Sequence, residues 1–212
     1  MVEAGIHWKY DFRNCAVIVA HPDDETLWAG GIMLLHPDCK WTVVTTCRKS
    51  DRDRATKFFR ALEQLNATGV MGDLDDGPEQ TPLSERKVQE TIVDLLSSKR
   101  FDLIITHGLW GEYTRHLRHE ETGRAVMALW KSENLFAEQI WRFAYEDGDG
   151  KYLPRAVDEA DFKIKLPDEI WVRKYDIITK VYGFSPDSFE AQTTPRQEAF
   201  RCFGADYKLN VV

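Results

Sequence analysis

The chain has 212 residues, of which 43% are hydrophobic and 30% are charged, and its formal net charge at pH 7 is -7. This length suits one domain with its own core, and the acidic balance argues against sequence-independent binding to nucleic acid. No stretch approaches the roughly 20 apolar residues of a membrane span, and residues 1–14 contain no apolar run that would direct export. We therefore expect residues 1–212 to form a single domain of a cytoplasmic protein.

The four cysteines agree with this expectation. Cys15, Cys39, Cys47 and Cys202 form no C-x-x-C pair and are too few for a disulfide scaffold at this length. We expect them to be reduced thiols, most of them buried.

Short strand-like runs alternate with helical periodicity along most of the chain. Strands are expected at residues 15–20, 41–46, 101–106, 139–145 and 162–166. Helices are expected at residues 25–35, 53–66, 119–132 and 168–182. This alternation predicts an α/β fold, in which a mostly parallel sheet carries helices on its faces.

Two further local signals stand out between these segments. One more helix is expected to begin at Pro82 with Thr81 as its cap, followed by an apolar stripe that includes Val88 and Ile92. The sequence EDGDG at 146–150 is the clearest loop signal of the chain.

The first expected strand ends in the sequence His21-Pro22-Asp23-Asp24-Glu25. Ligands of open α/β sheets bind at the carboxyl ends of the parallel strands, where this sequence lies. A phosphate loop does not fit, because Gly30 and Gly31 come after the turn and three carboxylates would repel a phosphate. Imidazole and carboxylate groups suit a divalent metal such as zinc, and a catalytic zinc needs about three protein ligands.

A second polar cluster follows the strand expected at residues 101–106. It contains His107, Glu112, His116 and His119, and the last two share one face if a helix begins there. Either cluster alone has an ordinary interpretation, as an acidic helix start or as a chance pair of surface histidines. Both clusters lie at the same edge of the expected sheet, and together they predict a metal site.

The other histidines are interpreted differently. The sequence His36-Pro37-Asp38 lacks the following carboxylate and lies between a helix and a strand, at the opposite edge of the sheet, so it is expected to be a plain turn. His7 lies in a polar segment and is expected to be exposed. His107 is expected to end a strand or to support the site from behind.

The sequences AHPDDETLWAGG and GEYTRHLRHEETGRAV, in this order, resemble the zinc-dependent de-N-acetylases of the PIG-L and LmbE-like family. Asp75-Asp76-Gly77 and the segment beginning at Lys174 are also similar, so that the resemblance covers most of residues 15–190. It implies a Rossmann-like fold with helices on both faces of a mostly parallel sheet and a site at the carboxyl edge of the strands. It also implies hydrolysis of the acetamide of an N-acetylglucosamine-type sugar or its conjugate.

The resemblance also assigns roles to individual residues. It implies that His21, Asp24 and His119 are the metal ligands, that Asp23 is the general base, and that a protonated His116 stabilises the transition state. Zinc is the expected ion, and ferrous iron or another divalent ion suits the same donors.

Substrate contacts are expected from Arg54, Asp76 and Tyr113. The ordinary interpretations of Arg54 and Asp76, a solvated helix residue and a turn residue, carry about equal weight. The tryptophans Trp28, Trp110 and Trp141 are expected to pack in the core more than to stack on a sugar.

One position departs from the family pattern. The family usually has an aspartate directly before the second histidine of His-x-x-His, and this chain has Arg118. The carboxylate that would tune His116 is therefore missing, or Glu120 or Glu121 replaces it.

Two alternatives to a de-N-acetylase remain. A metal-dependent hydrolase of another bond, such as a phosphoester, would normally need a second metal and more ligands than the sequence offers. A non-catalytic protein that binds a metal or a sugar has no need for a second carboxylate at Asp23 beside the metal. The expected partner is a small amino-sugar substrate, and a small domain also leaves a homo-oligomer open.

Overall fold

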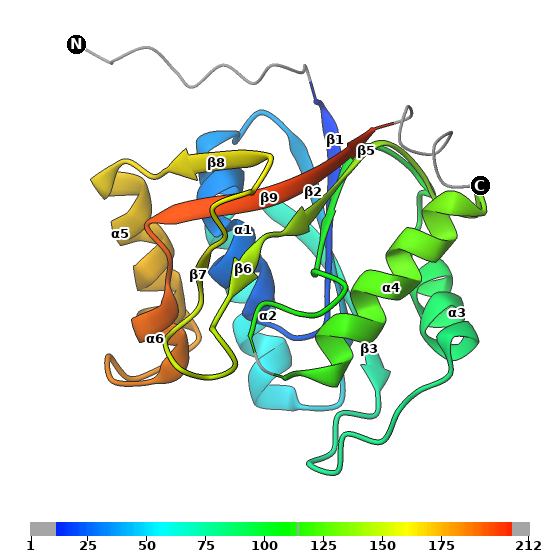
Figure 1. Cartoon of the computed structure of the whole chain (residues 1–212), viewed down its shortest axis with the longest axis horizontal. Coiled ribbons are helices and arrows are strands. Elements are labelled where there is room, and N and C mark those ends of the chain that lie inside the picture. The colour runs from blue at the N-terminus through cyan, green and yellow to red at the C-terminus, as the bar shows by residue number, and fades with distance from the viewer. Residues whose placement is uncertain (1–11, 114, 205–212) are drawn as a thin grey trace.

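A seven-stranded sheet lies at the centre of the computed structural model, which describes residues 12–113 and 115–204 (Figure 1). The strand order is β3-β2-β1-β4-β5-β9-β8. The first five strands in this order are parallel, and β9 runs antiparallel to both of its neighbours, β5 and β8. The strands are β1 (Asn14–Val19), β2 (Lys40–Cys47), β3 (Ala67–Leu74), β4 (Arg100–Thr106), β5 (Phe136–Phe143), β8 (Phe162–Lys165) and β9 (Gln197–Gly204). A separate ribbon pairs β6 (Tyr145–Glu146) with β7 (Arg155–Ala156).

Helices cover both faces of the sheet (Figure 1). One face carries α1 (Asp24–Leu35), α2 (Arg52–Gln64), α5 (Asp168–Asp176), the π-helical turn η1 (Ile177–Val181) and α6 (Phe189–Thr193). The other face carries α3 (Glu85–Leu95) and α4 (Leu117–Lys131). Because both faces are covered, neighbouring residues of β1 are buried in opposite cores: Val17 packs under α1 and α2, and Ile18 packs under α3 and α4.

The expected α/β fold with helices on both faces is therefore confirmed. Each strand and helix expected from the sequence has a counterpart, with bounds that differ by one to three residues for most of them. The expected loop at 146–150 is confirmed over residues 147–150, since Glu146 ends the short strand β6, and Gly148, Asp149 and Gly150 have positive φ angles. The segment expected as one helix over residues 168–182 changes to a π-helical turn after Asp176.

The expected start of α3 at Pro82 is wrong. The helix begins at Glu85, and Ser84 caps it by accepting a hydrogen bond from the Lys87 N–H. The backbone before Ser84 is instead held by other partners, because Thr81 O accepts a hydrogen bond from Arg118 and the Leu83 N–H donates to Glu121.

Two strands of the central sheet, β3 and β9, the two short strands β6 and β7, and the helix α6 were not expected from the sequence. Glycines interrupt the pattern of β3, and Gly69 is required there because a Cβ atom would lie 2.8 Å from the backbone oxygen of Val43 in β2 as well as 2.4 Å from the Leu62 side chain of α2. In β9 the fully buried Glu198 hides the apolar alternation; its carboxylate accepts the N–H groups of Gly31 and Ile32 in α1 and pairs with Lys174. The short helix α6 is capped by Ser188.

The cysteines and the helices of the described residues bear on two further expectations, reduced thiols and the absence of a membrane span. The four cysteines are free, and all but Cys202 are buried. Within residues 12–113 and 115–204, no helix has the length and apolarity to cross a bilayer. His7 lies outside the described residues.

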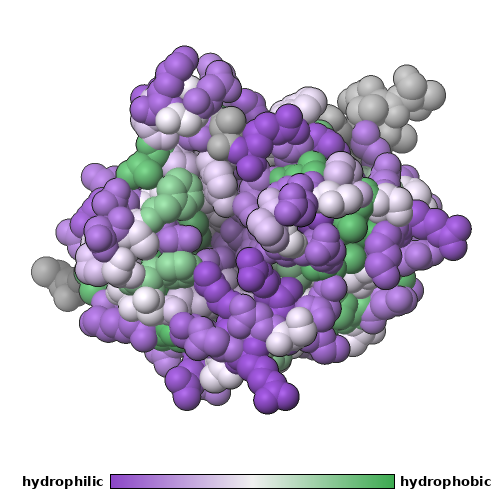
Figure 2. Space-filling model, turned by 90° about the horizontal axis from the view of Figure 1, so that it is seen from below, coloured by the Kyte–Doolittle hydropathy of each residue, from purple (hydrophilic) through white to green (hydrophobic). Residues whose placement is uncertain are grey.

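The carboxyl ends of the parallel strands lie at the lower edge of the molecule in Figure 1. Figure 2 looks onto this edge and shows a hollow surrounded largely by hydrophilic residues. A cavity of about 240 Å³ lies at this edge, where the site was expected. Residues from the loops after β1, β2, β3 and β4 line it.

Candidate metal centre and active site

Three potential ligand atoms meet at the carboxyl end of β1. His21 Nδ1 lies 3.1 Å from Asp24 Oδ2 and 3.2 Å from His119 Nε2, and the distance between His119 Nε2 and Asp24 Oδ2 is 3.3 Å. Asp24 is in the first turn of α1 and His119 is in the first turn of α4, so two helix starts bring the three atoms together. The three residues expected as metal ligands are therefore adjacent.

The size of this triangle fits a tetrahedral cation. Nitrogen and oxygen ligands about 2.0–2.1 Å from a zinc ion lie roughly 3.3 Å from one another. Glu112 Oε2 accepts a hydrogen bond from His119 Nδ1 at 2.8 Å, which leaves the lone pair of His119 Nε2 directed at the triangle. His21 Nε2 lies 3.2 Å from Asp76 Oδ1, an ion-pair contact without the alignment of a hydrogen bond.

The electrostatics of the triangle also favour a positive charge. Burial lowers the pKa of His119, but the charge of Asp24 and the hydrogen bonds to Asp24 and Glu112 together outweigh it, and the net pKa lies above its usual value. Burial raises the pKa of Asp24, yet the histidines hold that pKa well below its usual range. The donor set of two imidazoles and one carboxylate therefore fits a divalent cation.

His107 also lies near the triangle, but its ring nitrogens have other partners. Its Nε2 atom accepts the Ala20 N–H at 2.9 Å, and its Nδ1 atom lies 2.9 Å from Glu112 Oε2. An Nε2 lone pair that accepts a backbone N–H is not directed at a metal. His107 thus supports the site from behind, as one of its two expected roles requires.

Asp23 lies beside the triangle in a rare backbone conformation, with φ 124° and ψ -32°. Its side chain does not cap α1 and instead reaches the cavity, where Oδ2 lies 3.2 Å from Arg54 Nη1. Burial, reinforced by the charge of Asp24 and opposed by Arg54, raises the pKa of Asp23 to about 8. A carboxylate with this pKa is a strong base for its type.

His116 lines the same cavity and stacks on His119, with ring centroids 4.6 Å apart. Burial, together with His119 and His21, lowers the pKa of His116 to about 3, so its imidazole is neutral in this structure. A protonated His116 was expected, and the structure differs because burial and the nearby His119 and His21 disfavour a second positive charge there. Its Nδ1 atom is buried with no hydrogen-bond partner among the described residues.

Neither glutamate that was considered as a replacement partner of His116 has that contact. Glu120 pairs with Arg115 and Arg124, and Glu121 pairs with Arg118. Arg118 is 1% exposed and donates further hydrogen bonds to the Asp75 and Thr81 carbonyl groups. Arg118, the residue that departs from the family pattern, thus holds the loop after β3 against the start of α4.

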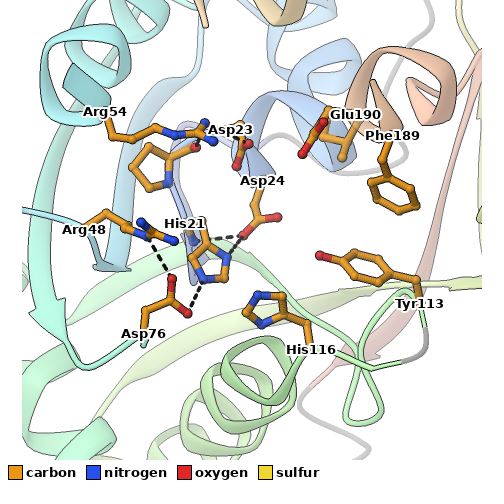
Figure 3. Close-up of a pocket in the computed structure, with 12 residues that line it drawn as sticks. His21, Asp23, Asp24, Arg48, Arg54, Asp76, Tyr113, His116, Phe189 and Glu190 are labelled. Atoms are coloured by element: carbon orange, nitrogen blue, oxygen red, sulfur yellow. Dashed lines mark hydrogen bonds and ion pairs between the residues drawn. The ribbon is translucent and has the colours of Figure 1, made fainter. Parts of the chain in front are cut away.

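The expected substrate contacts all line the cavity. Figure 3 shows Arg54, Arg48 and Asp76 on one side and Tyr113 and Phe189 on the opposite side, with His21 and Asp24 between them. Arg54 also packs on the Phe184 ring at 4.7 Å, and Asp76 Oδ2 accepts a hydrogen bond from Arg48 at 2.8 Å. Of the eight residues expected at the site, only His119 does not line the cavity, because it lies behind the surface and is 0% exposed.

Several residues of the site were not assigned from the sequence. Arg48, Phe189 and Glu190 line the cavity, and the Phe189 ring contacts Tyr113 edge to face at 5.0 Å. Phe189 and Glu190 belong to α6. Phe189 ends the segment from Lys174 that resembles the family, but the sequence assigned a role to neither residue. For Arg48 the only available signal was its position two residues after the strand expected at 41–46.

The tryptophans follow the expected pattern in part. Trp28 and Trp141 are buried in the core. Trp110 is 77% exposed and lies beside Arg124, and it does not line the cavity.

The sequence matches one protein family over more than half of its length. The sequence model of this family, PIG-L: GlcNAc-PI de-N-acetylase, matches residues 16–130. A curated relative, uncharacterized protein L374 of Acanthamoeba polyphaga mimivirus, is 23% identical over 124 residues, which cover 52% of this chain. The match spans about half of that relative, 55% of its length.

Solved structures with low sequence identity share the fold. N,N'-diacetylchitobiose deacetylase from Pyrococcus horikoshii is 15% identical with a TM-score of 0.67, covering 92% of this chain and 85% of that one. A deacetylase of teicoplanin biosynthesis is 15% identical with a TM-score of 0.63, covering 91% and 99%. GalB, a 4-carboxy-2-hydroxymuconate hydratase from Pseudomonas putida KT2440, is 13% identical with a TM-score of 0.61, covering 90% and 95%. Since this fold also carries a hydratase, the chemistry must be argued from the site.

Proposed function

Because the chain belongs to the PIG-L family of GlcNAc-PI de-N-acetylases, we propose that it is a metal-dependent hydrolase that removes the acetyl group of an N-acetylated amino sugar or its conjugate. The observation that carries the proposal is the triangle of donor atoms on His21, Asp24 and His119, with the Asp23 carboxylate beside it in one cavity. The products would be acetate and a free amine.

His21, Asp24 and His119 would hold the cation. Zinc suits two imidazoles and one carboxylate, and ferrous iron suits the same donors. When bound, the cation acts as a Lewis acid, which makes water a stronger acid and a carbonyl carbon a better electrophile.

Asp23 is proposed as the general base and then the general acid. Its carboxylate takes a proton from the attacking water while the new C–O bond forms at the acetyl carbon. It then returns the proton to the amine nitrogen as the C–N bond breaks. Burial raises the pKa of Asp23, which makes its carboxylate a better proton acceptor than an exposed one.

His116 is proposed to stabilise the oxyanion that develops on the acetyl oxygen. A neutral imidazole keeps one N–H donor, which is enough for this role in a buried site. Arg54 would fix the Asp23 carboxylate and contact the substrate beside it, and Asp76 and Tyr113 would contact the sugar. An N-acetylglucosamine-type substrate agrees with the diacetylchitobiose deacetylase of similar fold.

Acetate release tests the proposal. The metal-free protein would be loaded with zinc or ferrous iron and incubated with a panel of N-acetylglucosamine conjugates, with the metal-free protein as the control. We expect acetate from at least one conjugate with a loaded metal and none without. Stoichiometric metal binding together with sugar binding but no acetate across the panel would favour a non-catalytic binding protein.

A further inference from the structure

Glu25 is the third carboxylate of the run that begins at Asp23, and it does not line the cavity. Its side chain is fully buried and accepts three hydrogen bonds. Oε2 accepts the Asp23 backbone N–H at 3.0 Å, and Oε1 accepts the hydroxyl groups of Thr26 at 2.6 Å and Tyr182 at 2.7 Å. Glu25 therefore contacts the backbone of the proposed base rather than the cation or the substrate.

The backbone that Glu25 holds is the strained one. Residues other than glycine rarely adopt a φ of 124°, and such a conformation persists only where the surroundings enforce it. The Asp23 N–H is fixed by Glu25, and the Asp23 carbonyl oxygen accepts the Leu27 N–H at 2.8 Å. This conformation directs the Asp23 side chain into the cavity instead of over the N-terminus of α1.

Tyr182 connects Glu25 to the second half of the chain. The tyrosine is 2% exposed and directly follows the π-helical turn η1, where its N–H donates to the Ile177 carbonyl five residues earlier. Wider π-helical turns are frequent at functional sites. Tyr182 lies beyond residue 130, where the family match ends.

We propose that Glu25 and Tyr182 are positioning residues that together hold Asp23 in its strained conformation and thereby direct the base at the reacting atoms. The catalytic consequence rests on the proposed function, whereas the conformational coupling does not. Two variants separate the contacts. In Glu25→Gln the amide oxygen can keep the two donors at Oε1, which leaves the amide NH₂ facing the Asp23 N–H. Tyr182→Phe removes only the hydroxyl.

The first test measures the stability of the metal-free protein and needs no activity. Asp23→Gly relieves the positive φ, and we expect it to raise the folding equilibrium constant roughly fivefold or more in the wild-type background. In the Glu25→Gln or Tyr182→Phe background, Asp23 is no longer held at a positive φ. The increase in the folding equilibrium constant caused by Asp23→Gly should therefore be at least about threefold smaller. Equal gains in all backgrounds would overturn the proposed coupling, whether or not the protein is a de-N-acetylase.

The second test uses the metal-loaded protein. Tyr182→Phe should lower kcat about tenfold or more with KM unchanged within about twofold, since a displaced base slows the reaction without weakening binding. In an Asp23→Asn background the same substitution should cause no further loss of the residual rate. Tyr145→Phe is the matched control, because this buried hydroxyl contacts Gln197 and Ala199 and lies outside the cavity.

The comparison with Tyr145→Phe separates positioning from general destabilisation. If both tyrosine variants lose similar stability but only Tyr182→Phe loses kcat, the proposal is supported. An equal loss of kcat in both variants, or a loss that persists in the Asp23→Asn background, would overturn it. Absence of acetate release from the wild type would remove the proposed function and leave the stability test to decide the coupling.

Discussion

The Oε2 atom of Glu112 lies 2.8 Å from the Nδ1 atom of His119, and both side chains are fully buried. Burial raises the pKa of Glu112, but His107 and His119 outweigh it and lower that pKa to about 2, so the carboxylate is ionised. An ionised carboxylate behind a ligating imidazole fixes its tautomer and increases its basicity.

Replacing Glu112 should therefore weaken metal binding. We expect Glu112→Gln to lower the affinity for zinc by about 10–100-fold, as is typical for such supporting contacts. Competition with a chromophoric chelator measures this affinity. Glu121→Gln is the control, because Glu121 also forms a buried ion pair but has no contact with the three proposed ligands. Unchanged affinity in Glu112→Gln would contradict the assigned role.

Arg118 should contribute strongly to folding stability. Arg118→Ala removes its contacts with Asp75, Thr81 and Glu121 and leaves a carboxylate without its partner, so we expect a loss of about 3–5 kcal/mol. Urea denaturation measures it. Arg86→Ala is the comparison, since its ion pair with Glu90 is exposed on both sides and should contribute little to stability. Similar losses in both variants would argue against a loop fixed by Arg118.

Phe189 should affect substrate binding more than catalysis. Its ring forms the wall of the cavity together with Tyr113, so Phe189→Ala should raise KM about 5–10-fold with a smaller change in kcat. Steady-state kinetics on the conjugate that gives most acetate measures both constants. Phe59→Ala is the control, because Phe59 is similarly exposed but lies on α2 outside the cavity. A change in kcat alone would place Phe189 in a different role.

His36 should make the stability depend on pH. Burial lowers the pKa of His36 to about 3, whereas an unfolded histidine titrates near 6.5. Between these values the unfolded chain binds a proton that the folded chain does not, so this group destabilises the fold as pH falls from about 6.5 to about 3. The slope is below about 1.4 kcal/mol per pH unit, the limit for one proton, because solvent reaches part of the His36 side chain and weakens the effect. His36→Gln should remove it in urea denaturation of the metal-free protein, and an unchanged slope would contradict this prediction.

The sequence predicts those residues of the site that lie in short, continuous motifs. His21 to Glu25 follow a buried strand directly, and His116 and His119 are one helical turn apart after another strand, so the parallel sheet had to bring them to one edge. For a neighbouring residue such as Arg118, the sequence showed only that it differs from the aspartate usual in the family. Its three partners come from the loop after β3 and from α4, and only the folded structure shows them.

Other parts depended on tertiary contacts that leave little pattern in the sequence. In β3, Gly69 is present because the β2 backbone and α2 both lie close to it, and in β9 the buried Glu198 binds backbone groups of α1. Both residues weaken the usual strand signal. Phe189 reaches the cavity from a helix of five residues, which is too short to show a periodicity.

The division of roles between Asp23 and Asp24 is tested most directly by measuring zinc content and acetate release together in Asp23→Asn and Asp24→Asn. Asp24 contacts both histidines of the triangle, whereas Asp23 contacts Arg54 beside it. We predict that Asp23→Asn keeps one zinc per chain but loses at least about 100-fold in kcat, and that Asp24→Asn loses the zinc. An active Asp23→Asn variant, or an Asp24→Asn variant that retains its zinc, would contradict this assignment of the metal ligand and the base.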